Sequence, residues 1–291
     1  MTDATQPRRR RRVDGFALFW AAPAGIWQGL FFAGPLVVLV SMSFWVVRNF
    51  RLTPDFDLGN WERMLSRDFF WSGYAYTFQM AALVAVLASI IAFPAAQYLA
   101  FRASPGVRRL AIFLLVTPFF TSYLVRVYSW KIILSTEGVL NVMFGWLGLG
   151  PFGMIDNAFG AVVGYLTLCL PLVIIIQFFA LSAIDRSLIG AAHNLGCPPL
   201  KTTFTVTIPA ARIGLILAAT FAFILSFGDY VSPTFLGGGT PPTMSILVVD
   251  QTKSGNHWPR ASVVAVTMVL TLVTVLFAAL FAAYGRPGKK T

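Results

Sequence analysis

Long apolar stretches alternate with shorter polar segments along the whole chain. The hydrocarbon core of a bilayer is about 30 Å thick, so a helix that crosses it needs about 20 mostly apolar residues. Six stretches meet this requirement, at about 23–46, 76–100, 110–134, 160–183, 212–235 and 261–284. Backbone polar groups inside lipid have no water to bind, so these stretches must be helical. The pattern predicts an all-α integral membrane protein, a six-span helical bundle with no strand inside the membrane.

The composition agrees with a membrane protein and excludes two other classes. Of the 291 residues, 57% are hydrophobic and only 11% are charged, and 27 Phe stand against 11 acidic residues. A soluble domain carries about 25% charged residues and could not bury so much apolar surface in one core of this size. A soluble enzyme and a disordered chain are both excluded.

The basic residues predict the orientation. If the N-terminus is taken as cytoplasmic, that face holds fourteen Lys and Arg against three Asp, and the opposite face is neutral. The cytoplasmic basic residues are Arg8 to Arg12, Arg102, Arg108, Arg109, Arg186, Lys201, Arg212, Arg286, Lys289 and Lys290. Because Lys and Arg are enriched in cytoplasmic loops, we expect both termini in the cytoplasm, with the whole net charge of +11 on that face.

The chain is expected to form one membrane domain. Residues 1–22 are a basic cytoplasmic N-terminal segment, residues 23–284 the transmembrane domain with an inner loop at 184–211, and residues 285–291 a cytoplasmic tail. Five consecutive arginines could indicate nucleic-acid binding, but their place ahead of the first span favours a topology anchor and no nucleic-acid partner. A cleaved signal peptide is disfavoured because the apolar run continues past Val46.

The loops between the spans differ in character. The outer loop at about 48–75 is expected to lie at the membrane interface and cap the bundle through its aromatic residues, Trp61, Phe69, Phe70, Trp71 and Tyr74. Pro105 and Gly106 predict a plain turn over Arg102–Arg109. The outer loops at about 135–159 and 236–260 are glycine-rich or irregular. Gly160 and Gly164, four residues apart in the fourth span, predict close helix packing.

Residues able to do covalent chemistry are scarce. His193 and His257 fall on opposite sides of the predicted membrane, so they cannot share a metal, and we expect no metal site. Gly288-Lys289 resembles the end of a phosphate-binding loop, but the partner glycine would fall at Ala283 and no strand precedes it. Cys169 and Cys197 do not suggest a disulfide framework. We expect a chain that is not an enzyme and does not itself hydrolyse ATP.

Two ionisable residues fall inside predicted spans, where they are costly and usually face a partner or a watery cavity. Arg126 and Asp229 each lie 17 residues beyond an arginine at the inner boundary, Arg109 and Arg212 respectively. At 1.5 Å per residue both reach about 25 Å, near the outer edge. We expect them to form an ion pair or to flank a translocation path. The neighbouring candidates for this path are Tyr123, Tyr128, Trp130 and Tyr230. Alternatively, Arg126 extends to the outer headgroups.

The inner loop at about 184–211 carries the strongest functional signal. Ser187 is a suitable N-cap for a short helix through Leu195, and Gly196 is a natural terminator. Small residues at Ala191 and Ala192 would allow another surface to approach closely. The arrangement Ala191, Ala192, Gly196, Val206, Ile208 and Pro209 resembles the cytoplasmic-loop signature of permease subunits of ABC importers.

The resemblance implies a coupling helix that docks on a separate ATPase subunit. ATP and Mg would then be bound by that partner, and this chain would bind no cofactor. The family usually has Glu directly before the two alanines, where this chain has Gly190. With Ser187 as N-cap, residue 190 would be the third helical position, so a capping box is lost, and Gly costs a helix about 1 kcal/mol relative to Ala. The alternative is a stand-alone channel or secondary transporter, which would not need this loop pattern.

Further segments narrow the resemblance to permeases for spermidine and putrescine, the PotB/PotH-like family. They are Pro118 to Trp130, Gly138, Asn141, Gly148, Gly228 to Pro233, Leu236 to Gly238 and Asn256 to Pro259. The resemblance implies the ABC type I importer permease fold in a bacterial inner membrane. It also implies three kinds of partner protein: a second permease subunit, an ATPase dimer and a periplasmic substrate-binding protein. The solute would be a polyamine or a related nitrogenous compound.

Overall fold

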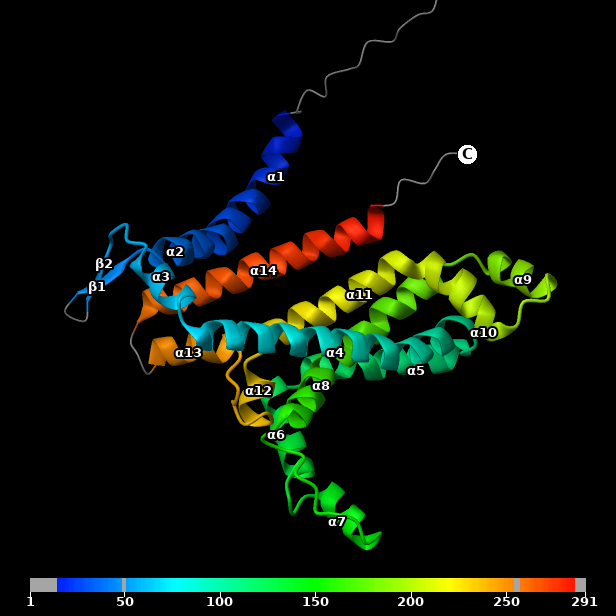
Figure 1. Ribbon diagram of the computed structural model, residues 1–291. Coiled ribbons are helices and arrows are strands. Elements are labelled where there is room, and N and C mark those ends of the chain that lie inside the picture. Colours follow the sequence, from blue (N-terminus) through cyan, green and yellow to red (C-terminus); the bar gives the residue numbers. More distant parts are fainter. Residues whose placement is uncertain (1–14, 49–50, 254–256, 286–291) are drawn as a thin grey trace, which may run out of the picture.

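The computed structural model describes residues 15–48, 51–253 and 257–285, and most of this chain is helical (Figure 1). Five helices are long and apolar enough to cross a membrane, at Ala22–Met42, Asp68–Phe101, Ala158–Ser182, Pro199–Gly228 and Trp258–Tyr284. A sixth candidate consists of two pieces, Pro105–Phe120 and Tyr123–Trp146, that meet at 98°. The predicted helical membrane protein is confirmed. The predictions for Arg8 to Arg12, Asn256, Arg286, Lys289 and Lys290 lie outside the described residues.

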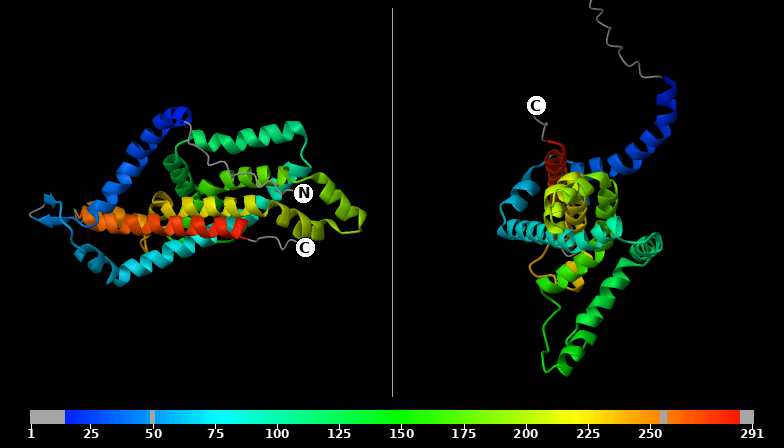
Figure 2. Two further views of the ribbon diagram at one scale, coloured as in Figure 1. Left: turned by 90° about the horizontal axis from the view of Figure 1, so that it is seen from above. Right: turned by 90° about the vertical axis from the view of Figure 1, so that its right-hand side faces the viewer.

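The N-terminal helix leans away from the rest of the molecule (Figures 1 and 2). It consists of α1 (Gly15–Gln28), a π-helical turn (Gly29–Ala33) and α2 (Gly34–Met42). The first span therefore ends four residues before the predicted boundary. Val46 instead begins the strand β1 (Val46–Arg48), which pairs antiparallel with β2 (Arg51–Thr53). After this hairpin, Asn60 at the start of α3 (Gly59–Leu65) donates hydrogen bonds to the carbonyls of Ser43 and Trp45.

The core is formed by α4 (Asp68–Phe101), α8 (Ala158–Ser182) and α11 (Ile208–Gly228), with α14 (Trp258–Tyr284) packed beside α11 (Figure 1). Small buried residues bring these helices together: α4 contributes Ala81, Ala85, Ala88 and Ala92, and α11 contributes Ala218 and Ala222. Alanine allows helix backbones to approach closely, which favours dispersion contacts where the surrounding solvent is lipid.

The two glycines of α8 make a close contact, as predicted. A Cβ atom on Gly164 would lie 2.6 Å from the Ser232 Oγ of α12 (Val231–Phe235), and one on Gly160 would collide with the Leu236 carbonyl. The same region places Ser232 and Leu236 in the buried interior. Both glycines are therefore required by the packing of α8 on the segment after α11.

The third predicted span is not one helix. It consists of α5 (Pro105–Val116), a 3₁₀ turn (Thr117–Phe120) and α6 (Tyr123–Leu134), with α7 (Val139–Trp146) following. Pro118 has no N–H to donate, and Thr121 and Ser122 are extended, so the helix cannot continue across them. The inner turn is also shorter than predicted. Ser104 caps α5 by accepting from the Val107 N–H, and Pro105 is the start of that helix rather than a breaker.

The fifth predicted span and two outer loops also differ from expectation. α11 ends at Gly228, Asp229 is extended, and α12 follows it. The third outer loop contains the helix α13 (Met244–Lys253). In the first outer loop, α4 begins at Asp68, eight residues early, so most of the predicted interfacial aromatics lie on a helix. Phe70 is fully buried against Met64 and Met244 rather than at the interface.

Candidate functional site

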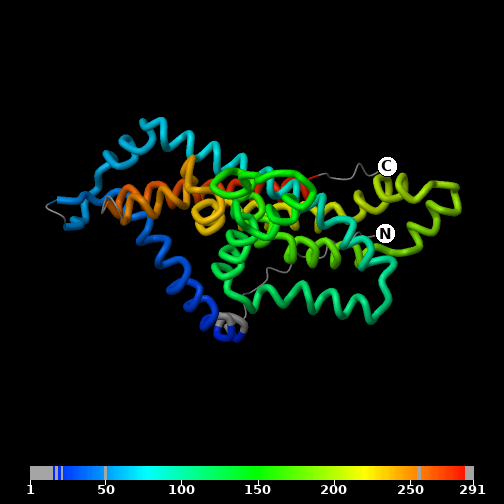
Figure 3. Tube along the Cα trace, turned by 90° about the horizontal axis from the view of Figure 1, so that it is seen from below, coloured from blue at the N-terminus to red at the C-terminus, as the bar shows by residue number. Residues whose placement is uncertain are grey.

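The residues that resemble a coupling loop lie at one end of the molecule. α9 (Arg186–Asn194) and α10 (Pro199–Thr202) project there, and the β1–β2 hairpin is at the far end (Figures 1 and 3). A π-helical turn (Thr203–Thr207) joins α10 to α11, so Val206, Ile208 and Pro209 stand at the start of a helical run that ends at Gly228. We call residues 184–209 the coupling segment.

The N-cap of α9 is Asp185, not Ser187. The Asp185 carboxylate accepts a hydrogen bond of 2.9 Å from the Ser187 backbone N–H. This bond holds the pKa of Asp185 below its ordinary value. Ser187 is thus the second helical residue and Gly190 the fifth. The prediction that a Glu at position 190 would complete a capping box is therefore wrong, because the third position is Leu188.

Gly196 ends α9, as predicted. Its φ of +76° lies in the left-handed region that glycine adopts without strain. The Gly196 N–H donates to the His193 carbonyl at 2.9 Å and the Cys197 N–H to the Ala192 carbonyl at 3.0 Å. These two bonds form a Schellman motif, which satisfies carbonyls that the helix leaves without partners. The chain direction after α9 is therefore fixed by the backbone.

One side of α9 is exposed in the described part of the chain. Ala191 and Gly190 are exposed, and a Cβ atom on Gly190 would meet nothing within 4 Å. Leu188 and Leu195 are 50% and 88% exposed. The small size of residues 190 and 191 is therefore not required by the packing of this chain, and the face they form is accessible to a partner.

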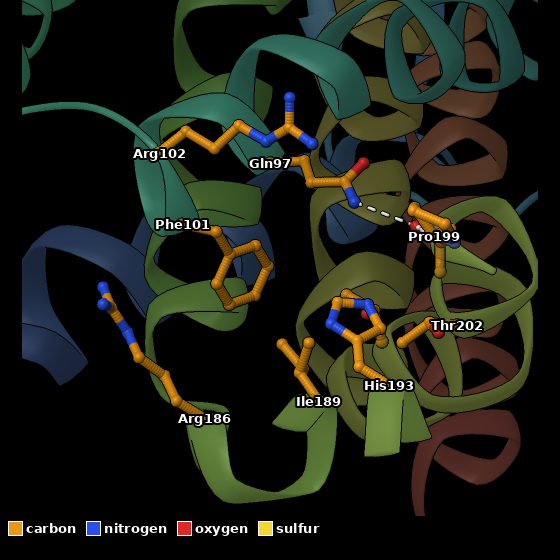
Figure 4. Close-up of a pocket in the computed structure, with 10 residues that line it drawn as sticks. Gln97, Phe101, Arg102, Arg186, Ile189, His193, Pro199 and Thr202 are labelled. Carbon is orange, nitrogen blue, oxygen red and sulfur yellow. Dashed lines mark hydrogen bonds between the residues drawn. The ribbon is translucent and has the colours of Figure 1, made fainter. Parts of the chain in front are cut away.

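The other side of α9 faces a cavity of about 230 Å³ below the end of α4 (Figure 4). Ile189 and His193 point into it from α9, and Phe101 points into it from α4 (Figure 4). Gln97 and Thr203 close a further side through a hydrogen bond of 3.0 Å from the Gln97 Nε2 to the Thr203 Oγ1. The cavity leaves space between the coupling segment and the core helices.

Two arginines bond to the end of α4: Arg186 attaches the coupling segment there, and Arg108 attaches α5. Arg186, the first residue of α9, donates to the Ala100 carbonyl at 3.3 Å. Arg108 donates to the same carbonyl at 3.2 Å and to the Leu99 carbonyl at 3.1 Å. Cations are favourable at a helix C-terminus, where carbonyls lack partners and the dipole is negative. In the sequence these arginines indicated only orientation, and no local signal pairs them with α4.

A second cluster joins the two helix breaks. The Tyr123 hydroxyl, just after the break in the third span, donates to the Asp229 carboxylate and hydrogen-bonds the Ser232 hydroxyl. Asp229 is only 8% exposed, and its carboxylate also accepts from the backbone N–H groups of Val231 and Ser232. The Ser245 hydroxyl donates to the Asp229 carbonyl. Sequence analysis missed Ser232 and Ser245, whose only signal is that they are polar residues within apolar surroundings.

Arg126 and Asp229 do not form the predicted ion pair. Among the described residues, the one ion pair within 4.0 Å joins Arg48 to Asp55. The Arg126 guanidinium instead donates to the Pro118 carbonyl at 2.9 Å and the Thr167 carbonyl at 3.3 Å. Pro171 has no N–H, so the Thr167 carbonyl loses its helical donor and Arg126 supplies one. The prediction that Arg126 and Asp229 lie at equal depth fails because it counts residues along a straight helix, and the third span bends before residue 126.

The remaining path candidates are dispersed around this cluster. The Arg126 guanidinium lies 5.8 Å from the centre of the Tyr123 ring, so Tyr123 is the link between Arg126 and Asp229. Arg126 and Trp130 line a cavity of about 440 Å³. Tyr128 packs on Phe235 with ring centres 5.0 Å apart, and Tyr230 is the residue before α12. Within the ranges that the structure describes, no three His, Cys, Asp or Glu residues gather to hold a metal ion.

Comparisons with known proteins identify the family. A model of the binding-protein-dependent transport system inner membrane component matches residues 85–286. The spermidine/putrescine transport system permease protein PotB of Escherichia coli K12 is 26% identical over 260 residues, covering 86% of this chain and 91% of its own. The inner membrane ABC transporter permease protein YdcU of the same organism is 28% identical over 300 residues, covering 94% and 92%.

A solved structure shares the fold. One chain of a bacterial ABC transporter that imports the acidic polysaccharide alginate aligns with a TM-score of 0.72 at 15% sequence identity, covering 94% of this chain and 96% of the other. The family model spans more than half of the chain, including the coupling segment, three of the five long helices and the second half of Asp68–Phe101. The chain therefore belongs to the family of binding-protein-dependent transport system inner membrane components and is a permease subunit of an ABC importer.

Proposed function

We propose that this permease imports spermidine, putrescine or a related nitrogenous compound, and that the coupling segment is where a separate ATPase subunit drives it. The substrate class is supported by the names of relatives, which include PotB over most of the chain and the putrescine permease PotI of Escherichia coli K12 at 31% identity over 114 residues.

The observation that carries the coupling role is the two-sided arrangement of α9. Its outer face presents the exposed residues Gly190 and Ala191, with open space around Gly190, while its first residue is bonded to the end of α4. A partner that pulls on α9 would therefore move α4 through Arg186, and would move α11 through the helical run that starts at Pro199. The ATPase would bind ATP and Mg, and this chain would bind no cofactor.

The proposed assembly contains a second permease, an ATPase dimer and a periplasmic binding protein in the inner membrane, with both termini of this chain cytoplasmic. A related alginate transporter has been solved with its periplasmic protein bound, which supports partners of this kind. Among the described side chains of α1 and α2, Phe16, Trp27 and Val37 are more than 60% exposed, which leaves that surface for lipid or for the second permease. Alternating access would need no covalent chemistry from this chain.

The test replaces Ala191 with Arg in the assembled transporter. Arginine fits at this exposed position without disturbing the chain, but it would block close approach of the ATPase. We expect at least a tenfold loss of ATPase recovered with the tagged permease, and uptake of labelled spermidine and putrescine at background. Gly106→Arg is the matched control, because Gly106 also lies in an open position on an inner-side helix.

The outcomes separate the parts of the proposal. Normal ATPase recovery and uptake in Ala191→Arg would show that α9 is not the coupling helix. A functional wild-type complex that takes up neither polyamine would disprove the substrate class alone. Purification of homo-oligomers without an ATPase would favour a stand-alone channel.

A further inference from the structure

Three arginines gather at the end of the molecule opposite the coupling segment. Arg63 on α3, Arg67 before α4 and Arg260 in the first turn of α14 line one cavity of about 170 Å³. Met64, Phe69 and Gln251 complete its lining. The elements that carry the arginines meet beside the β1–β2 hairpin (Figure 1). We call Arg63, Arg67 and Arg260 the arginine cluster.

The arginine cluster has no counter-ion in the part of the chain that the structure describes. No Asp or Glu oxygen there lies within 4.0 Å of these three guanidinium groups, although the nearby Arg48 is paired with Asp55. Glu62 and Asp68 are the sequence neighbours of Arg63 and Arg67, but neither pairs with the cluster, and the fold brings the three cations together around one cavity. Arg63 and Arg67 are exposed to solvent, and Arg260 is partly buried.

One neighbouring group responds to the positive potential of the cluster, and two helix N-termini add to it. Burial, followed by the charges of Arg260 and Arg63, lowers the pKa of His257 below its ordinary value. The N-termini of α4 and α14, helices of 34 and 27 residues, both begin next to the cluster. The positive end of a helix dipole favours anions. Three cations and two helix N-termini around one cavity give a local positive potential that attracts anions.

We propose that the arginine cluster is the docking site for an acidic patch on the periplasmic binding protein, an inference that rests on the proposed function. An arginine fork binds a carboxylate through two parallel hydrogen bonds, so three arginines around one concavity match several Asp or Glu side chains at once. A lipid phosphate offers a single charge to the same three cations. The site lies at the end opposite α9, where a binding protein would approach while the ATPase occupies the other end (Figure 3).

The experiment measures binding of the cognate binding protein to the complete transporter in nanodiscs. Three variants are compared with the wild type. The first is the single variant Arg63→Gln, and the second is a triple variant in which Arg63, Arg67 and Arg260 are all replaced by Gln. The third is the control Arg51→Gln, on β2 at the same end of the molecule. We expect about threefold weaker binding for Arg63→Gln, at least tenfold for the triple variant, and less than twofold for Arg51→Gln. Binding to the wild type should also weaken steeply with salt, and that dependence should flatten in the triple variant.

The exposed single variant keeps the test valid if the triple variant does not assemble. Unchanged binding in Arg63→Gln and in a correctly assembled triple variant would refute the docking site and leave the proposed function intact. If the triple variant binds normally but no longer responds to anionic lipid in the nanodisc, the cluster binds lipid phosphate and the inference is wrong. Absence of any binding to the wild-type transporter would instead contradict the proposed function.

Discussion

Gly190 lowers the stability of α9, the proposed coupling helix. It lies in the interior of α9, where glycine costs about 1 kcal/mol relative to alanine because its backbone is freer in the unfolded state. A Cβ atom at this position would meet no heavy atom within 4 Å, and its backbone does not need a positive φ. Gly190→Ala should therefore stabilise α9 by nearly the full amount, with no opposing steric cost.

A stabilisation of about 1 kcal/mol corresponds to about a fivefold change in an equilibrium constant. The amides of α9 that exchange by local opening should therefore exchange about five times more slowly in Gly190→Ala. Native-state hydrogen exchange of the permease in nanodiscs, read by mass spectrometry over residues 186–194, measures this directly. Gly106→Ala in α5 is the control, since it has the same open surroundings but should leave α9 unchanged.

The affinity of the ATPase for α9 should rise in Gly190→Ala as well. If part of the cost of binding the ATPase is the ordering of α9, a pre-formed helix would tighten that binding by up to the same fivefold factor. Unchanged or faster exchange in α9 would refute the assignment of Gly190 to a strain-free helical interior. Slower exchange with unchanged ATPase affinity would show instead that α9 is already ordered before docking.

Three further predictions concern the folded protein. Tyr123→Phe leaves the Asp229 carboxylate without its hydroxyl donor, and should lower the free energy of unfolding in micelles by about 1.5–3 kcal/mol, while Tyr128→Phe should have little effect. Gly164→Ala places a Cβ against α12 and should cost about 1–3 kcal/mol in the same assay. The pKa of Asp185 is lowered in the folded protein, so its capping bond stabilises α9 at pH values above the unfolded pKa of 3.8. This stabilisation is lost as the pH falls through the folded pKa, so a spin label on α9 should gain mobility in acid. Asp185→Asn, which caps without titrating, should not show that change.

The regular spans could be predicted from hydropathy alone. α8 and α14 lie within three residues of their expected positions, since polar residues bound their apolar runs on both sides. The breaks at Ser122 and Asp229 were missed because the apolar composition continues through them. Pro118 and the Gly228-Asp229 pair were the only local signs, and a proline or glycine inside a membrane helix is too common to locate a break.

The coupling segment shows a different limit. Asp185 and Ser187 are equally good N-caps by residue type, and local sequence cannot choose between them. A tertiary contact selects Asp185 as the N-cap. When the helix starts at Arg186, the Arg186 guanidinium reaches the Ala100 carbonyl, 86 residues earlier in the chain. The link through Tyr123 is likewise a long-range contact, since it depends on how two bent spans meet.

The longest helix connects both ends of the molecule without interruption. α4 runs for 34 residues, about 51 Å, from beside Arg67 to the carbonyl held by Arg186. The spans on which the polar cluster lies are broken at Ser122 and Asp229, whereas α4 continues as one helix through Pro94 between the two surfaces proposed for partners. An axial shift imposed on α4 at one surface would be carried toward the other, so this helix offers a mechanical route by which the loaded state of one partner reaches the other.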